Sequence, residues 1–148
     1  MALIGLTGLL ALAASGLLGG GSRPVLAAKG PQAELRIKTP AVMRSGMFFE
    51  TLVEVRARQA IAKPVLAISE SYWRDITINT IEPAPASEDS ETAMFLFEYE
   101  PMEAGDQLRV KFDGQINPSL FAGTAGRIEL RDDTRTIASL PLDLTVLP

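Results

Sequence analysis

The sequence of 148 residues contains no cysteine and no histidine. Without cysteine no disulfide can form, so core packing and strand pairing have to hold the fold together, and a chain of this length can bury a sufficient core. The two absences also remove Ser-His and Cys-His nucleophiles, imidazole acid–base catalysis near neutral pH, and the usual protein ligands of zinc, copper and haem. We therefore expect a protein that is not an enzyme, with no catalytic residue, no cofactor and no metal.

Basic residues are scarce as well. The chain has 14 lysines and arginines against 18 aspartates and glutamates, which gives a formal net charge of −4. Proteins bind nucleic acid largely through clustered lysines and arginines that neutralise phosphates. A weakly acidic chain offers no such surface, so we expect no nucleic acid among the partners.

Charge of either sign is missing from the first 22 residues. Residues 1–22 have no ionisable side chain and are almost wholly apolar. At about 1.5 Å per helical residue they would cover roughly 33 Å, just enough to cross a bilayer. The sequence therefore predicts one N-terminal apolar helix over residues 1–22, which is either a transmembrane anchor or a signal segment.

Both interpretations of this segment stay open. An uncleaved anchor fits its length, and Gly5, Gly8 and Gly16 would allow close packing against another helix. A secretory signal fits the helix-breaking glycines 19–21 and the small residues within 25–28, but the usual basic N-terminal region is missing. We favour the anchor.

The side of the membrane on which the rest of the chain lies is a separate question. Arg23, Lys29, Arg36 and Lys38 follow the apolar run, and the positive-inside rule would keep that side in the cytoplasm. Single β domains that follow one span are more usual outside the cytoplasm. We expect a single-pass membrane protein with its β domain outside the cytoplasm, with secretion after cleavage as the alternative.

Beyond the apolar segment, Pro24, Gly30 and Pro31 predict a linker over residues 23–32, and residues 33–148 read as one domain. Apolar and polar residues alternate with a period of two along most of this domain, which is typical of half-buried strands. We predict eight strands: Ala33–Thr39, Glu50–Arg58, Pro64–Ser69, Ile76–Ile81, Met94–Glu100, Gln107–Gln115, Gly126–Asp132 and Thr136–Val146.

Each predicted strand has one apolar face and one polar face, as two packed antiparallel sheets require. Turn-forming residues separate the strands at intervals of roughly ten residues, and Asp132–Arg135 predicts a tight turn between the last two. Ser69–Asp75 could form a short helical turn. The fold class that follows is all-β, an antiparallel immunoglobulin-like β-sandwich of about seven to eight strands.

Four aromatic residues are candidates for binding a partner: Tyr72, Trp73, Phe48 and Phe49. Trp73 is the only tryptophan, and in many immunoglobulin-like domains a mid-domain tryptophan fills the space between the sheets. The opposing interpretation is an exposed aromatic anchor for a partner protein or for the lipid interface. The pair Phe48 and Phe49 raises the same question.

Two groups of carboxylates could carry chemistry. Glu98 and Glu100 would lie about 7 Å apart on one face of a strand, within the range that glycosidases use. Glu88, Asp89 and Glu91 could bind calcium. Solvated strands and hairpin tips produce the same patterns, and neither group is accompanied by a sugar platform or by an EF-hand loop. We interpret both groups as ordinary surface.

The C-terminal half resembles small bacterial membrane-anchored proteins that carry one extracytoplasmic immunoglobulin-like domain, a poorly characterised group. The resemblance covers roughly a third of the chain and implies architecture and location, but no catalytic or binding residue. It is carried by Phe97-Glu98-Tyr99, by Gly105 with Leu108-Arg109-Val110, by Gln115-Ile116-Asn117-Pro118 with Gly123 and Gly126, and by Leu144-Thr145-Val146-Leu147-Pro148.

The leading hypothesis is a non-enzymatic, membrane-tethered, extracytoplasmic module that binds or scaffolds another envelope protein. The alternative is a solute- or carbohydrate-binding β-sandwich, which the four aromatic residues would favour if they were exposed together at one end. A hydrolase built on Glu98 and Glu100 is the least favoured interpretation.

Overall fold

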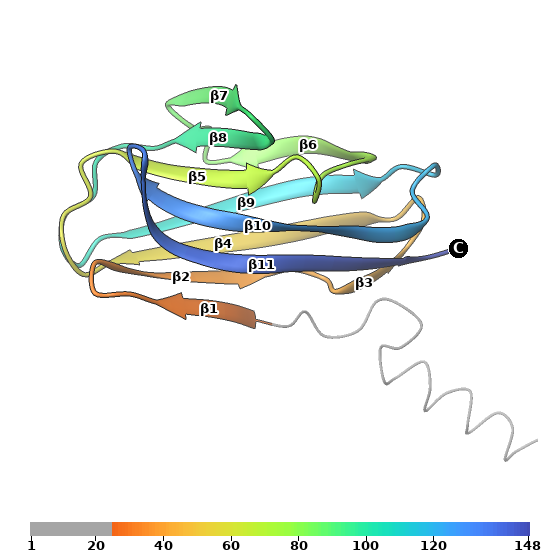
Figure 1. Cartoon of the computed structure of the whole chain (residues 1–148), viewed down its shortest axis with the longest axis horizontal. Coiled ribbons are helices and arrows are strands. Elements are labelled where there is room, and N and C mark those ends of the chain that lie inside the picture. Colours follow the sequence, from red (N-terminus) through yellow and green to blue (C-terminus); the bar gives the residue numbers. More distant parts are fainter. Residues whose placement is uncertain (1–24) are drawn as a thin grey trace, which may run out of the picture.

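The structure is a computed structural model that describes residues 25–148. Within this range the chain forms eleven strands and no helix, and the strands make two packed sheets (Figure 1). The predicted all-β sandwich is therefore confirmed. The strands are β1 (Val25–Lys29), β2 (Ala33–Lys38), β3 (Val42–Arg44), β4 (Phe48–Ala57), β5 (Pro64–Ser69), β6 (Ile76–Glu82), β7 (Ser87–Glu91), β8 (Met94–Glu98), β9 (Gln107–Ile116), β10 (Ala122–Asp132) and β11 (Arg135–Leu147).

The five-stranded sheet has the order β1-β2-β4-β9-β6, and the six-stranded sheet has the order β3-β11-β10-β5-β8-β7. Neighbouring strands are antiparallel with one exception, since β3 runs parallel to β11. One lateral edge of the sandwich is formed by β1 and β3, and the other by β6 and β7 (Figure 1).

The core lies where the apolar faces of the two sheets meet. In β4 the inward side chains of Val53 and Val55 are buried, while Glu54 and Arg56 point away. The alternation predicted for β11 is confirmed as well, because its five apolar residues from Ala138 to Val146 are all buried. Burial of each such side chain contributes about 1.5–3 kcal/mol relative to its exposed state, so this pattern sets the register of both sheets.

All eight predicted strands are present, but the number of strands is eleven rather than seven or eight. Strand β1 lies within the predicted linker, where it pairs with β2 along its whole length. Strand β3 has only three residues and pairs in parallel, so the expectation of a purely antiparallel fold was wrong at this position. Strand β7 is exposed at every position. Short or fully exposed edge strands need no apolar alternation, and the sequence pattern therefore missed them.

Several strand ends differ from the prediction by one or two residues, and β10 begins at Ala122, four residues before the predicted Gly126. Strand β8 ends at Glu98 instead of Glu100. Ser69–Asp75 forms no helical element: after β5 the segment makes consecutive turns, with one hydrogen bond from Tyr72 N to Ser69 O (3.1 Å). The tight turn predicted at Asp132–Arg135 is confirmed, since β10 ends at Asp132 and β11 begins at Arg135.

The apolar segment 1–22, with its predicted helix, lies outside the described residues. Among residues 25–148, no helix has the length and apolar character that a membrane span needs.

The connection from β9 to β10 has an unusual backbone where it enters β10. Gly123 has a φ of +134°, and a Cβ atom at this position would overlap the carbonyl group of Leu144 on β11. Gly105 also has a positive φ, of +92°, but open space surrounds the position of its missing Cβ. Glycine is therefore required at position 123 both by its positive φ and by the close approach of Leu144, whereas at position 105 only the positive φ favours glycine.

We expect Gly123→Ala to lower the free energy of unfolding by about 3 kcal/mol or more, because backbone strain and overpacking add at this position. The matched control Gly105→Ala should cost only about 1–2 kcal/mol, the cost of a left-handed backbone for a residue with a Cβ. Urea unfolding of the two variants measures the difference. Equal losses would contradict the close approach of Gly123 to β11.

Candidate functional site

A cleft of about 480 Å³ opens at the lateral edge where β6 of one sheet faces β7 and β8 of the other. Figure 1 shows this edge, with β6 lying beside the hairpin of β7 and β8. Ile76, Ile78 and Ile81 of β6 line one side of the cleft, and Phe95 and Phe97 of β8 line the other. Such a volume is in the usual range for binding pockets, which measure roughly 300–1,000 Å³.

The cleft exists because the six-stranded sheet is wider than its apolar core. Strand registers place Glu88 opposite Phe97 and Ser90 opposite Phe95, so the face that β7 turns toward the other sheet is polar. A polar strand cannot close a core against β6, and apolar packing stops at β8. On the opposite side, a register shift between Ile78 and Thr80 disturbs the pairing of β6 with β9.

Trp73, in the connection from β5 to β6, forms the floor of the cleft. Its ring centroid lies 5.6 Å from that of Phe95, 5.8 Å from that of Phe97 and 5.3 Å from that of Phe112. Aromatic pairs at these distances contribute about 0.5–1.5 kcal/mol each beyond area burial. Trp73 therefore packs on the core with one part of its ring system and remains partly accessible with the other.

The connection from β6 to β7 forms a fixed wall of the cleft. Tyr99 donates a hydrogen bond from its hydroxyl to the carbonyl of Pro83 (3.2 Å), and the amide of Ala86 donates to the carbonyl of Glu98 (2.8 Å). Burial, and secondarily the nearby Glu88 carboxylate, raise the pKa of Tyr99 to about 12. The hydroxyl thus stays protonated and can keep donating to Pro83 across the physiological pH range.

The structure does not gather the four aromatic candidates on one surface. Tyr72 is buried between the sheets, and Phe49 is buried at 7% exposure, whereas Phe48 at the start of β4 is 71% exposed. Only Trp73 lines the cleft. A platform of four exposed rings, which would have favoured a carbohydrate-binding function, is therefore not present.

Phe95 and Phe97 were not predicted as cleft residues, because the alternation in the predicted strand Met94–Glu100 is typical of a strand that faces a core. A usable signal lay just before it. Ser87–Glu91 is polar at five consecutive positions and is joined by a two-residue turn to an aromatic strand. A polar strand paired with an apolar one indicates an aromatic face that lacks full cover.

The carboxylate candidates do not converge on a site. Glu88 turns toward the cleft, whereas Asp89 and Glu91 are on the opposite face of β7. No group of three acidic side chains within residues 25–148 is placed to hold a metal ion. Glu98 pairs with Lys63 at 3.6 Å and accepts a hydrogen bond from Ser87 (3.1 Å), while Glu100 is exposed beyond the end of β8.

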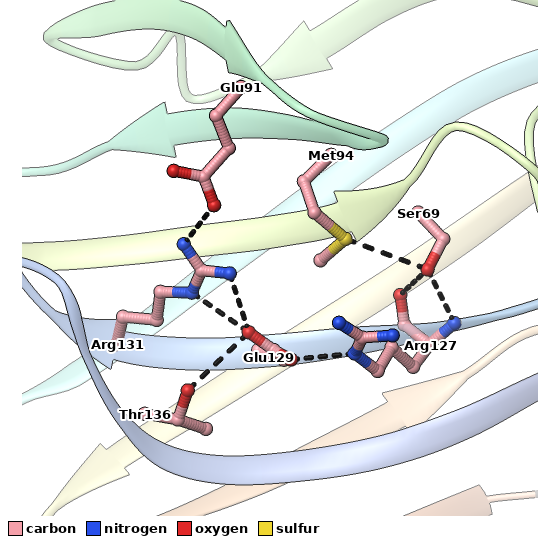
Figure 2. Close-up of polar contacts among 7 residues, drawn as sticks. All are labelled: Ser69, Glu91, Met94, Arg127, Glu129, Arg131 and Thr136. Atoms are coloured by element: carbon pink, nitrogen blue, oxygen red, sulfur yellow. Dashed lines mark hydrogen bonds and ion pairs between the residues drawn. The ribbon is translucent and has the colours of Figure 1, made fainter.

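The most buried charges lie on the outer face of the six-stranded sheet, where Figure 2 shows a chain of ion pairs. Glu129 of β10 accepts hydrogen bonds from Arg127 (2.6 Å) and from Arg131 (2.8 Å). Arg131 also donates to Glu91 of β7 at 2.7 Å, across the intervening β5 and β8. The cluster fastens the outermost strand β7 to β10, and within the described residues no buried polar side-chain atom lacks a partner. We interpret it as a structural cluster.

Two opposing effects set the pKa of Glu129. Burial raises it, but the hydrogen bonds and charges of Arg127 and Arg131 outweigh burial and hold the pKa below its usual value. A carboxylate with a depressed pKa stabilises the fold above its unfolded pKa, and this contribution is lost as the pH falls through the folded value.

The residues described define a two-sheet β-sandwich domain with a lateral aromatic cleft. No protein-family model and no curated protein matches the chain. Among solved structures, it is similar to the chitin-binding domain of a chitinase from Pyrococcus furiosus, with 15% sequence identity and a TM-score of 0.46 over 77% of this chain and 100% of that one. It is also similar to CaCohA2 from Clostridium acetobutylicum, with 12% identity and a TM-score of 0.43 over 84% of this chain and 93% of that one. Both similarities concern the overall sandwich, and neither identifies a binding residue.

Replacement of Glu129 tests the ion-pair cluster. We expect Glu129→Gln to lower the free energy of unfolding at neutral pH by about 1–3 kcal/mol, because Arg127 and Arg131 lose a buried charged acceptor. Below about pH 4.5 the wild-type chain should lose stability more steeply than the variant, which has no carboxylate to protonate at this position. Urea unfolding between pH 3 and 7 measures both effects, with the exposed Glu103→Gln as control. Parallel pH profiles of wild type and Glu129→Gln would contradict the lowered pKa.

The two tyrosines allow a direct test of burial around the cleft. Burial is the main cause that raises the pKa of both Tyr72 and Tyr99, so the folded chain should show little phenolate absorbance near 295 nm at about pH 10.5, whereas the urea-unfolded chain should be largely titrated. A raised tyrosine pKa stabilises the fold below the unfolded pKa of about 10, and this contribution is lost as the pH rises toward 12. In Tyr99→Phe only Tyr72 can form a phenolate, so the difference from the wild-type chain gives the absorbance of Tyr99. Half-titration of Tyr99 near pH 10 in the folded chain would disprove the burial of its hydroxyl.

Proposed function

We propose that this protein is a non-enzymatic, immunoglobulin-like binding module whose cleft between β6 and β8 receives apolar side chains from an extended segment of another envelope protein. The observation that carries the proposal is the aromatic floor of Trp73, Phe95 and Phe97 in an open cleft of about 480 Å³. The packed ring cluster fixes these side chains before any ligand arrives, so binding would require little ordering of this surface.

The edges of the cleft favour an extended peptide over a compact solute. Among residues 25–148, strand β6 pairs only with β9 and β7 only with β8, so within this range each presents one edge of unpaired backbone groups. Such edges accept an additional strand through main-chain hydrogen bonds, while neighbouring pockets take alternate side chains. The carboxylate of Glu88 lines the cleft beside its apolar side chains, so the chemistry fits a segment with alternating apolar and basic residues.

Residues 1–22 would hold this module at the membrane, with the sandwich outside the cytoplasm; secretion after cleavage is the alternative. The support is the absence of any ionisable side chain from Met1 to Ser22, in a run long enough to cross a bilayer. Only Arg23 and Pro24 separate that run from β1. A binding module fixed so close to the lipid would meet partners that are themselves at the membrane.

A solute- or carbohydrate-binding function is the second candidate, because the volume of the cleft suits a small ligand. It is the weaker one, since Tyr72 and Phe49 are buried and Trp73 is engaged by three phenylalanine rings. A hydrolase has less support still, because Glu98 is paired with Lys63 and neither Glu98 nor Glu100 lines the cleft.

Obstruction of the cleft at its mouth tests the proposal. Ala84 is exposed and lines the cleft, whereas its neighbour Ala86 is exposed and does not. We expect Ala84→Arg to weaken binding of a seven-residue peptide of alternating lysine and apolar residues by about tenfold or more, corresponding to about 1.4 kcal/mol. Ala86→Arg introduces the same charge two residues away and should leave binding nearly unchanged, which separates steric obstruction from charge repulsion.

Binding is read from the emission of Trp73 in the full-length chain held in lipid nanodiscs. Failure of the wild-type chain to bind the peptide, or equal losses in the two variants, would contradict a peptide site in the cleft. A response of Trp73 to an apolar dye but not to the peptide would favour the solute-binding alternative.

A further inference from the structure

Three large apolar side chains are exposed at one end of the sandwich. Met47 is 40% exposed, Phe48 is 71% exposed and Phe121 is 73% exposed. We refer to these three residues as the apolar tip. Among the described residues, the only other large hydrophobic side chain with comparable exposure is Val25 at 50%. Isolated exposed apolar residues are ordinary, but several at one end indicate a contact surface.

The apolar tip is built on two connections that are bonded to each other. The amide of Ile116 donates to the carbonyl of Met47 (2.9 Å), and the amide of Gly46 donates to the carbonyl of Ile116 (3.0 Å). Ser45 donates from its hydroxyl to the carbonyl of Pro118 (3.4 Å). The segment before Phe48 and the segment before Phe121 are therefore fastened side by side.

The backbone around Phe121 presents this side chain to solvent. Leu120 is buried at 2% exposure, while the next residue, Phe121, points outward. Ala122 follows with a φ of +66° and Gly123 with a φ of +134°. A left-handed conformation costs an alanine about 1–2 kcal/mol. The chain thus adopts a costly conformation directly after an exposed phenylalanine.

Strand directions bring the N-terminal segment to this same end. Val25 pairs with Lys38, Lys38 pairs with Leu52, and β4 begins at Phe48, four residues before Leu52. Because β1 runs in the same direction as β4, its first residue, Val25, lies at the end of β1 that is nearer the apolar tip. At about 3.3 Å per residue, Val25 lies roughly 13 Å below the level of Phe48.

The length of the connection is the decisive constraint. From Ser22 to Val25 there are three residue steps, which span at most about 10 Å when fully extended. Counted instead from Leu18, so that glycines 19–21 also stay outside the bilayer, the span is at most about 24 Å. The second value exceeds the roughly 13 Å between Val25 and the level of Phe48 by roughly 10 Å. The apolar tip would then lie at most about this far from the lipid, little more than one headgroup layer.

We infer that the apolar tip lies against the lipid surface of the membrane that holds residues 1–22. This inference rests on the membrane tether of the proposed function and is independent of the cleft. Phenylalanine and methionine side chains gain free energy when they enter the boundary between headgroups and acyl chains.

The absence of cysteine allows a clean test by single labels. Ser119 is exposed in the same connection as Phe121, and Thr134 is exposed in the turn at the opposite end of the sandwich. Ser119→Cys and Thr134→Cys, each with one fluorescent label, are reconstituted as full-length chains in vesicles of phosphatidylcholine and phosphatidylglycerol that carry a nitroxide quencher on the headgroup. We expect quenching of the Ser119→Cys label to be several-fold stronger than that of the Thr134→Cys label.

Replacement of the rings with Phe48→Ser and Phe121→Ser should reduce this difference while residues 1–22 keep the chain on the vesicles. Equal quenching of the two labels in vesicle-bound chains, or quenching at Ser119→Cys that the double replacement leaves unchanged, would overturn the inference and leave the tether intact. Failure of the chain to float with the vesicles would overturn the tether and the inference together, whereas peptide binding by the cleft would be unaffected. Energy transfer between labelled copies without lipid, rising with protein concentration, would assign the tip to a second copy and overturn the lipid contact.

Discussion

The structure depends on a mismatch in width between its two sheets. The six-stranded sheet extends by one polar strand, β7, beyond the apolar surface that the five-stranded sheet can cover. From the edge at β3 as far as β8, close apolar packing joins the two sheets. Beyond β8, at β7, the sheets separate. Arg131 compensates on the outer face, because its hydrogen bonds to Glu129 and Glu91 hold β7 in the sheet without any core beneath it. The aromatic cleft is the direct result of this arrangement.

The sequence predicted those parts of the fold in which burial imposes a period of two. Strands such as β9 and β11 are confirmed almost to the residue, because a one-residue slip would expose every inward side chain. Strands β1, β3 and β7 lie at sheet edges and are short or fully exposed, so they show too little of this pattern to be recognised. For the site, Trp73 could be found as the only tryptophan, but its neighbours depend on pairings across the chain. Whether Phe95 faces a core or an opening depends on β7: its five polar residues are a signal in the sequence, but only the strand pairing places them beside Phe95 and Phe97.

The two proposed surfaces occupy different parts of the sandwich. The chain enters at β1, which is one lateral edge, while the cleft lies at the opposite edge beside β6 (Figure 1). The apolar tip is at one end, where the connections before β4 and β10 meet. A partner in the cleft would therefore not compete with the entering chain or with lipid. If both proposals hold, the arrangement would separate attachment from recognition on a domain of 124 described residues.

The pairing of β1 with β2 also determines how the domain would bear load. Val25 is the first residue of β1, so tension applied at Val25 along β1, with the rest of the domain held, would act parallel to the strand. All the hydrogen bonds that connect Val25–Lys29 to β2 would then resist in shear together, instead of opening one after another from an end. If the proposed tether holds, a strand that adds little to the hydrophobic core would thus act as a mechanical attachment, and its strength would come from its direction.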